Sequence, residues 1–208
     1  MLLADEYYFV AHEDTTGKPR LHPRAVGLGV ACGLLAELVF ANRVTIGGGN
    51  VTVIDRTAPE DALAHTTLDQ LIQEQQHRAV RTWLTFLAQT AVDGVAQRLL
   101  RAGQVRTERV RRGLRQVDIY VPTNMSAAAW PEHRLRHHII NGQQITMGDA
   151  ALAGMIAATG LTDRIMWDAD AGGRRYFAYI LGALPQPLRE LCAHTEAAVG
   201  DAVLTHRL

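Results

Sequence analysis

The run Ala25–Ala41, AVGLGVACGLLAELVFA, decides the fold of this chain. Wound as a helix it is apolar on every side, and its small residues let other helices approach closely. A membrane-spanning helix needs about 20 apolar residues, and a carboxylate such as Glu37 is costly inside one. The run therefore predicts a helix that is buried by its neighbours. We expect Glu37 to find a hydrogen-bond donor in Arg43 or in an amide of the segment that follows.

The sequence on either side of this run predicts further helices and two short β-hairpins. Apolar residues recur at helical spacing in several segments, and alternating apolar residues flank the triple glycine at 47–49. The expected helices cover residues 2–14, the stretch from Thr66, residues 79–102, the stretch from Trp130, residues 147–158 and residues 185–206. The fold class that follows is mainly α with small β-hairpins, in a single domain over residues 1–208.

Composition places the chain among ordinary globular proteins. It has 208 residues, of which 48% are hydrophobic, so it can bury a sizeable core without disulfides or a structural metal. Its formal net charge is zero. Cys32 and Cys192 lie in apolar helical patterns and are expected to be buried thiols. The acids Asp5 and Glu6 lie close to the first residue, where a signal peptide would have a basic segment and an apolar run. We therefore expect no signal peptide and a cytoplasmic protein. Lys18 stands alone against 20 arginines, a bias typical of GC-rich bacterial genomes.

The segment Gln97–Val121, QRLLRAGQVRTERVRRGLRQVDIYV, carries a strong local charge. A helix is expected to end at Gly103, followed by a strand, a turn around Gly113 and a second strand. Seven arginines and one acid, Glu108, lie between positions 98 and 115 of a neutral chain. This charge favours a phosphate-bearing partner, namely a lipid head group, a membrane surface or nucleic acid. The alternative is a solvated hairpin with arginines on its wet face. The residues assigned to the hairpin surface are Arg106, Arg109, Arg111, Arg112 and Arg115.

A helix followed by a strand–turn–strand unit also resembles the wing of a winged-helix protein, so DNA binding is an alternative function. Such a protein reads base edges with Arg, Asn or Gln on an exposed helix. The residues available for this role before the hairpin are Gln89, Gln97, Arg98 and Arg101. A protein-binding adaptor without lipid binding is a further alternative.

The residue patterns give no argument for an enzyme, a metal site or a cofactor. His133 and His137 have a spacing that can chelate a metal, but Arg134 and Arg136 flank them and would repel a cation. Phosphate-loop, dinucleotide-binding and nucleophile-elbow motifs are absent from the sequence. Aromatic residues in apolar helical runs are expected in the core, and they are Trp83, Phe86, Tyr176, Phe177 and Tyr179.

Several segments together resemble the Golgi phosphoprotein 3 family, which has eukaryotic members and many actinobacterial ones. Residues 2–18, LLADEYYFVAHEDTTGK, are similar to the family's opening helix and acidic Thr-Gly loop. Residues 33–44 resemble its apolar LxELxLxxRI helix end, and residues 68–71 are similar to its LLDEAL helix. Residues 99–105, LLRAGQV, resemble its LVxKGVL junction between helix and hairpin, and residues 120–122 the segment after it. These matches follow one another in order over nearly the whole chain.

The resemblance implies both an architecture and a function. The architecture is a core helical bundle ringed by amphipathic helices, with a projecting Arg-rich hairpin. The function is that of a non-enzymatic peripheral membrane protein that recognises phosphatidylinositol 4-phosphate and acts as an adaptor. In the family the hairpin serves membrane contact and self-association, so a homo-oligomer is also implied.

The resemblance places a lipid head-group site as well. The pocket tryptophan of the eukaryotic relatives corresponds to His22, and their basic pocket positions fall near Ala31, Gln89 and Val92. Positive charge in the neighbourhood is supplied by Arg24, Arg78 and Arg81. The predicted head-group residues are His22, Arg24, Arg81 and Gln89. Because the family's basic residues are replaced, we expect binding to follow membrane charge more than head-group stereochemistry.

Overall fold

The computed structural model describes residues 1–112 and 115–204, and within them it confirms a mainly α-helical fold with two antiparallel hairpins. The helices are α1 (Leu3–Ala11), α2 (Pro23–Phe40), α3 (Ala62–Gln73), α4 (Val80–Leu87), α5 (Ala91–Arg101), α6 (Met125–Ile140), α7 (Met147–Thr159), α8 (Thr162–Met166), α9 (Ala171–Ala183) and α10 (Gln186–Leu204). The strands are β1 (Val44–Gly47), β2 (Asn50–Val53), β3 (Val105–Arg112) and β4 (Arg115–Pro122).

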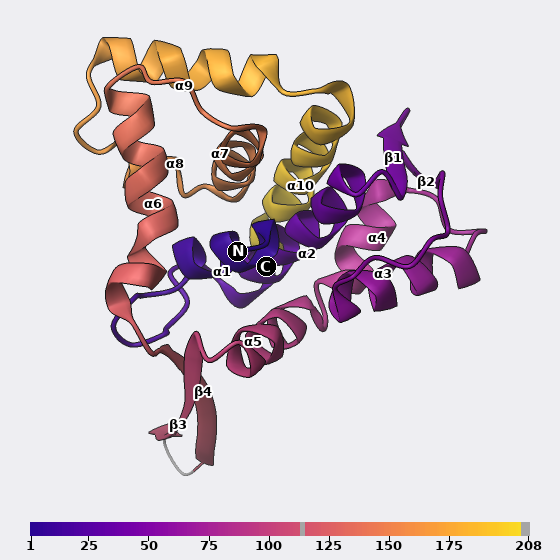
Figure 1. The fold of residues 1–208 in the computed structure, drawn as a ribbon, viewed down its shortest axis with the longest axis horizontal. Coiled ribbons are helices and arrows are strands. Elements are labelled where there is room, and N and C mark those ends of the chain that lie inside the picture. Colours follow the sequence, from indigo (N-terminus) through magenta and orange to yellow (C-terminus); the bar gives the residue numbers. More distant parts are fainter. Residues whose placement is uncertain (113–114, 205–208) are drawn as a thin grey trace.

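The helix α2 runs through the centre of the fold, as the sequence predicted (Figure 1). It is long and apolar enough to cross a membrane, but 78% of that window is buried, and α1, α5, α7 and α10 pack around it. Its glycines permit this close packing. A methyl group at Gly29 would lie 2.2 Å from the ring of Tyr7, and one at Gly33 would lie 2.8 Å from the Cα atom of Ala4.

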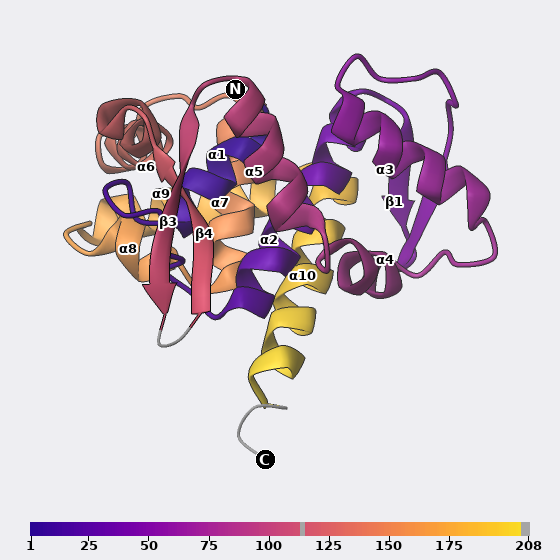
Figure 2. The same ribbon diagram turned by 90° about the horizontal axis from the view of Figure 1, so that it is seen from below.

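The other elements flank this centre on two sides (Figures 1 and 2). α6, α8 and α9 lie on one side, and the β1–β2 hairpin lies with α3 and α4 on the other. The β3–β4 hairpin, paired from Val105↔Pro122 to Arg112↔Arg115, projects from the body as the family resemblance implied. At its base Gly17 has a φ of +66°, and a methyl group there would lie 1.9 Å from the carbonyl oxygen of Tyr120. Only glycine fits this contact without a shift of the backbone.

The expected continuous helix over residues 79–102 is wrong, because a turn at residues 88–90 separates α4 from α5. In this turn the N–H groups of Gln89 and Thr90 donate to carbonyls three residues back, as in a 3₁₀ turn. The break brings the Ala88 carbonyl against α2, where a methyl group at Gly27 would lie 2.7 Å from its oxygen. Apolar spacing misses the turn because both helices keep apolar residues toward the core.

Three other helix boundaries differ from expectation. α1 ends at Ala11 rather than at residue 14. α3 begins earlier than Thr66, because Asp61 caps it by accepting the N–H of Ala64 at 2.9 Å. α6 begins before Trp130, with Asn124 as its cap and Pro131 inside the helix. Side-chain caps therefore set the starts of α3 and α6.

Most of the expected core is buried, with two exceptions among the aromatic residues. Phe86 and Tyr179 are 46% and 69% exposed, because each is out of phase with the buried face of its helix. Trp83 and Phe177 are buried as expected. Cys32 is buried and Cys192 is half-buried, and both are free thiols.

A buried ionic cluster joins α2 to α1, α5 and the start of α3. At its centre is Arg98, whose guanidinium lies 2.7 Å from Asp5, 3.1 Å from Glu37 and 2.9 Å from Asp61. Burial raises the pKa of Asp5 and of Glu37, and attraction to Arg98 offsets only part of this rise. Burial opposes the charge of Arg98 itself, but the surrounding carboxylates outweigh it and hold its pKa above the ordinary value.

The expectation that Glu37 is hydrogen-bonded is confirmed, but the expected partner is wrong. Arg43 pairs with Asp55 at 2.6 Å instead. Glu37 accepts the N–H of Ala4 at 2.8 Å in addition to the guanidinium of Arg98. Arg98 is 61 residues away along the chain, so local sequence gives no sign of this pair.

Candidate functional site

A cleft of about 390 Å³ opens between α2, α4 and α10. These helices pack against one another, and Figure 2 shows α4 beside α2 and α10. Its apolar lining is buried or half-buried and comprises Leu28, Ala88, Ala198 and Ala202. Its polar lining is exposed and comprises Arg24, Arg81, Thr85, Gln89 and Asp201. The cleft therefore combines an apolar wall with polar groups that solvent can reach.

Two guanidinium groups and one carboxylate set the charge of this cleft. Arg81 forms an ion pair with Asp201, and their side chains are 47% and 67% exposed. Arg24, in the first turn of α2, makes no side-chain hydrogen bond or ion pair within the described residues. Among the described lining residues one positive charge is thus in excess, and the positive end of the α2 dipole lies beside it. Because exposed ion pairs are weak, an anion that enters the cleft can replace Asp201 as the partner of Arg81.

Three of the four residues predicted for a head-group site meet in this cleft. Arg24 comes from α2, Arg81 from α4, and Gln89 from the turn that follows α4. His22 instead caps α2, with its Nδ1 atom accepting the backbone N–H of Arg24 at 3.3 Å. Arg78 lines a different pocket, beside the β1–β2 hairpin.

The remaining positions singled out by the resemblance do not line the cleft. Ala31 is fully buried in α2, and Val92 is half-buried against the core. Conversely, Asp201 is a cleft residue that sequence reasoning missed. It is 120 residues from Arg81, and nothing in the local sequence distinguishes it from the other acids of the last helix.

The Arg-rich hairpin is less cationic than its sequence indicates. Arg106 pairs with Glu108 on its own strand at 2.7 Å, and Arg109 pairs with Asp118 on the facing strand at 3.1 Å. Arg111 is exposed on β3. The side chains of Arg112 and Arg115 are not among those that the structure describes. Two of the five arginines assigned to this surface are therefore already offset by acids.

The helix before the hairpin does not present the face expected of a DNA reader. Arg98 is only 8% exposed and is held in the buried ionic cluster. Gln97 donates to the hydroxyl of Tyr120 at 2.7 Å, and Gln89 belongs to the turn before α5. Of the proposed base-reading residues, only Arg101 projects from the exposed side of α5 without a hydrogen bond or ion pair among the described residues.

Within residues 1–112 and 115–204, no group of three or more His, Cys, Asp or Glu side chains is placed to hold a metal ion. His133 and His137 line a hollow on the surface of α6 together with Arg136. The guanidinium of Arg136, which pairs with Asp168, lies in this hollow and disfavours a cation there.

Comparison with protein families gives a match that covers nearly the whole chain. The model described as Golgi phosphoprotein 3 (GPP34) matches residues 3–202. No curated protein matches the sequence. The matched range includes the cleft residues from Arg24 to Ala202 and the whole β3–β4 hairpin.

Proposed function

Because the chain belongs to the Golgi phosphoprotein 3 family, we propose that it is a non-enzymatic, peripheral membrane protein of the cytoplasm. Its ligand is the phosphate-bearing head group of an anionic phospholipid, of the type exemplified by phosphatidylinositol 4-phosphate. The head group binds in the cleft between α2, α4 and α10.

The observation that carries this proposal is the meeting of Arg24 and Arg81 in one apolar-walled cleft. Guanidinium groups present a planar fork of N–H donors that matches phosphate oxygens. The amide of Gln89 adds a neutral donor at the same rim. A volume of about 390 Å³ also lies within the range of small-ligand sites.

The charge of the cleft favours modest affinity and low stereochemical selectivity. Asp201 forms an ion pair with Arg81, so a head group must compete with this carboxylate. Arg24 is exposed and reaches the cleft through a long, flexible side chain. We therefore expect binding to rise with the negative charge of the membrane and to fall with salt.

The projecting hairpin supplies a second membrane contact and a surface for self-association. It extends beyond the helical body, so its arginines can reach a surface that the body does not touch (Figure 1). Each Arg near an anionic membrane contributes roughly 1 kcal/mol. The hairpin and the cleft together favour salt-sensitive docking rather than permanent anchoring.

The test is vesicle flotation with neutral phosphatidylcholine, phosphatidylserine-containing and phosphatidylinositol 4-phosphate-containing membranes. The double variant Arg24→Gln/Arg81→Gln should partition onto both anionic membranes about tenfold less than the unmodified protein. Arg175→Gln is the matched control, because it removes an exposed arginine on α9, away from the cleft. Its partition should stay unchanged.

Three results would contradict the proposal. Unchanged flotation of the double variant would remove the cleft from the binding site. Equal binding to neutral and anionic vesicles would remove charge from the mechanism. A DNA mobility shift at the same salt would favour the nucleic-acid alternative if no vesicle binding is seen and the shift is lost when Arg109, Arg111, Arg112 and Arg115 are replaced by glutamine.

A further inference from the structure

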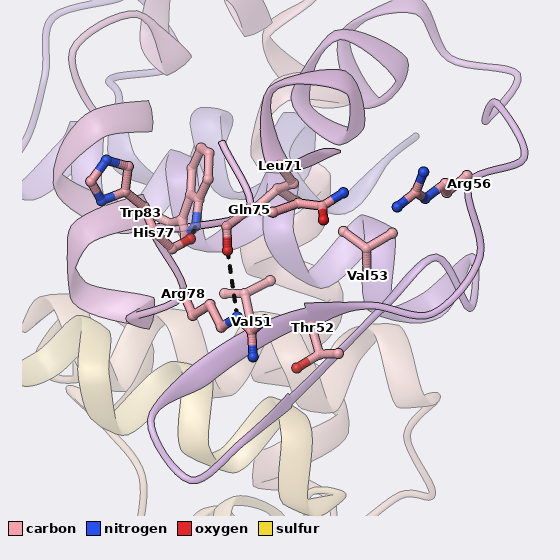
Figure 3. A pocket seen from close by; sticks show the side chains of 9 residues that line it. All are labelled: Val51, Thr52, Val53, Arg56, Leu71, Gln75, His77, Arg78 and Trp83. Atoms are coloured by element: carbon pink, nitrogen blue, oxygen red, sulfur yellow. Dashed lines mark hydrogen bonds between the residues drawn. The ribbon is translucent and has the colours of Figure 1, made fainter. Parts of the chain in front are cut away.

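A second, smaller pocket of about 150 Å³ lies between the β1–β2 hairpin, the end of α3 and the segment before α4 (Figure 3). Its buried lining is apolar and consists of Val51, Leu71 and Trp83, which are 5%, 4% and 3% exposed. Its remaining lining side chains are more exposed and mostly polar, and two of them are the arginines Arg56 and Arg78. This pocket is separate from the cleft described above, and the two have no lining residue in common.

Backbone hydrogen bonds fix the walls of this pocket. The N–H of Val51 donates to the carbonyl of Arg78 at 2.8 Å. The N–H of Val80 donates to the carbonyl of Gly49 at 2.9 Å. The indole N–H of Trp83 donates to the carbonyl of His77 at 2.6 Å. The segment before α4 is thereby tied to the hairpin on one side and to α4 on the other, so hydrogen bonds of the protein itself hold the pocket walls in place.

The rim of the pocket is cationic and is not neutralised by its own lining. None of the nine lining residues, all of which the structure describes, is an acid. Arg56 makes no hydrogen bond or ion pair within the described residues. The hydrogen bond recorded for the Arg78 side chain is a long one, 3.4 Å, from Nε to the carbonyl of Gln75. The nearby acid Asp55 is engaged by Arg43 and Thr57 instead.

Donor groups also converge on this rim. Figure 3 shows the amide end of Gln75 and the guanidinium of Arg56 pointing toward each other across the pocket. The Nε of Arg78 lies on the hairpin side of the pocket and faces the backbone carbonyl of Gln75. Figure 3 draws the guanidinium groups of Arg56 and Arg78 at opposite ends of the pocket, so an anion at the rim lies between two positive charges.

We propose that this pocket binds a carboxylate carried on a short apolar group. The apolar group lies on Val51, Leu71 and Trp83, and the carboxylate accepts N–H donors from Arg56 and Arg78. The volume is below that of sites for drug-sized ligands, so the occupant is a small acid or the end of a larger one. Such chemistry is supplied by a free branched-chain acid or by the C-terminal apolar residue of a peptide.

The test follows the fluorescence of Trp83 in a Trp130→Phe/Trp167→Phe protein, which leaves one indole. The titrants are isovalerate, N-acetyl-leucine, the neutral N-acetyl-leucinamide and inorganic phosphate. We expect at least one of the two acids to shift Trp83 emission, and both leucinamide and phosphate to bind at least fivefold more weakly than that acid. Arg56→Gln and Arg78→Gln should each weaken binding about fivefold. Arg175→Gln is the matched control and should leave binding unchanged.

The outcomes separate the two sources of the carboxylate and decide the proposal. Equal binding of isovalerate and N-acetyl-leucine supports a free acid, whereas binding of N-acetyl-leucine alone supports a peptide end. Absence of binding by both acids overturns the proposal. The proposal is also overturned if leucinamide or phosphate binds as tightly as the acids. Binding that survives both arginine substitutions overturns it as well. Unfolding midpoints of the variants show whether a loss of binding reflects loss of the fold. Because no lipid is present, these results are independent of the head-group proposal.

Discussion

Two regions of this protein use arginine in opposite ways. At the junction of α1, α2 and α5, Arg98 is 8% exposed and is surrounded by three carboxylates. In the cleft between α2, α4 and α10, Arg24 and Arg81 are exposed, and the one carboxylate of the lining, that of Asp201, pairs with Arg81. The first region has an excess of acid, and the second has an excess of base.

The difference shows how burial decides what an arginine does. A buried guanidinium must be paired, and once it is surrounded by carboxylates it holds helices together and is closed to ligands. An exposed guanidinium gains little from one exposed partner, so it stays available to an anion from outside. Counting arginines along the sequence, as in the segment Gln97–Val121, does not separate the two cases.

The largest expected effect is on stability, at the buried cluster. Arg98→Met should destabilise the fold by about 3–5 kcal/mol, because three carboxylates lose their buried counter-charge. Glu37→Leu should cost less, since Arg98 keeps two carboxylates as partners. Urea unfolding at neutral pH measures both. Equal losses in the two variants would contradict the description of Arg98 as the centre of the cluster.

The next effect concerns membrane binding by the hairpin. Replacing four of its arginines by glutamine should lower binding to anionic vesicles by about 2–3 kcal/mol at most, at roughly 1 kcal/mol per charge near the surface. The loss of binding free energy is smaller than that expected for four unpaired charges, because Asp118 already offsets Arg109. Flotation at low and high salt measures the effect, and binding unchanged at low salt would exclude the hairpin as a membrane contact. The positions replaced are Arg109, Arg111, Arg112 and Arg115.

A smaller effect is expected in the pH dependence of stability. The pKa of Glu37 is raised by burial in the fold, so the folded protein takes up this proton at a higher pH than the unfolded chain. Stability contributed by this group therefore rises as pH falls from neutral toward its ordinary pKa of 4.5, and this contribution is absent from a Glu37→Gln variant.

The measurement is the free energy of unfolding of the two proteins at several pH values between 7 and 5. On acidification the unmodified protein should gain stability relative to Glu37→Gln. Burial lowers the pKa of His12 to about 4, which acts in the opposite direction, but this titration is common to both proteins and cancels in the comparison. Parallel pH profiles would show that the carboxyl of Glu37 has the same pKa in the folded and unfolded states.

The sequence predicted the features that depend on local pattern. The all-round apolar run at residues 25–41 identified the central helix, and the alternation after Gly103 identified the β3–β4 hairpin, whose projection from the body only the family resemblance implied. The resemblance brought Arg24, Arg81 and Gln89 into one candidate site, and the structure places all three in one cleft.

The features that sequence reasoning missed depend on contacts between distant segments. Arg98 reaches Glu37 across 61 residues, and Asp201 reaches Arg81 across 120 residues. The turn at residues 88–90 contains no helix-breaking residue, and its Ala88 carbonyl packs closely against Gly27 of α2. No periodicity or capping signal in one segment carries information about such partners.

The most direct test of the account is the substitution Asp201→Asn, measured by titration with phosphatidylserine-containing vesicles. If an excess of arginine in the cleft binds the head group, removal of the competing carboxylate should raise affinity about threefold, the scale of one exposed ion pair. Asp163→Asn removes the same charge from an exposed position on α8 and should leave affinity unchanged. Unchanged or weaker binding of Asp201→Asn would contradict the account.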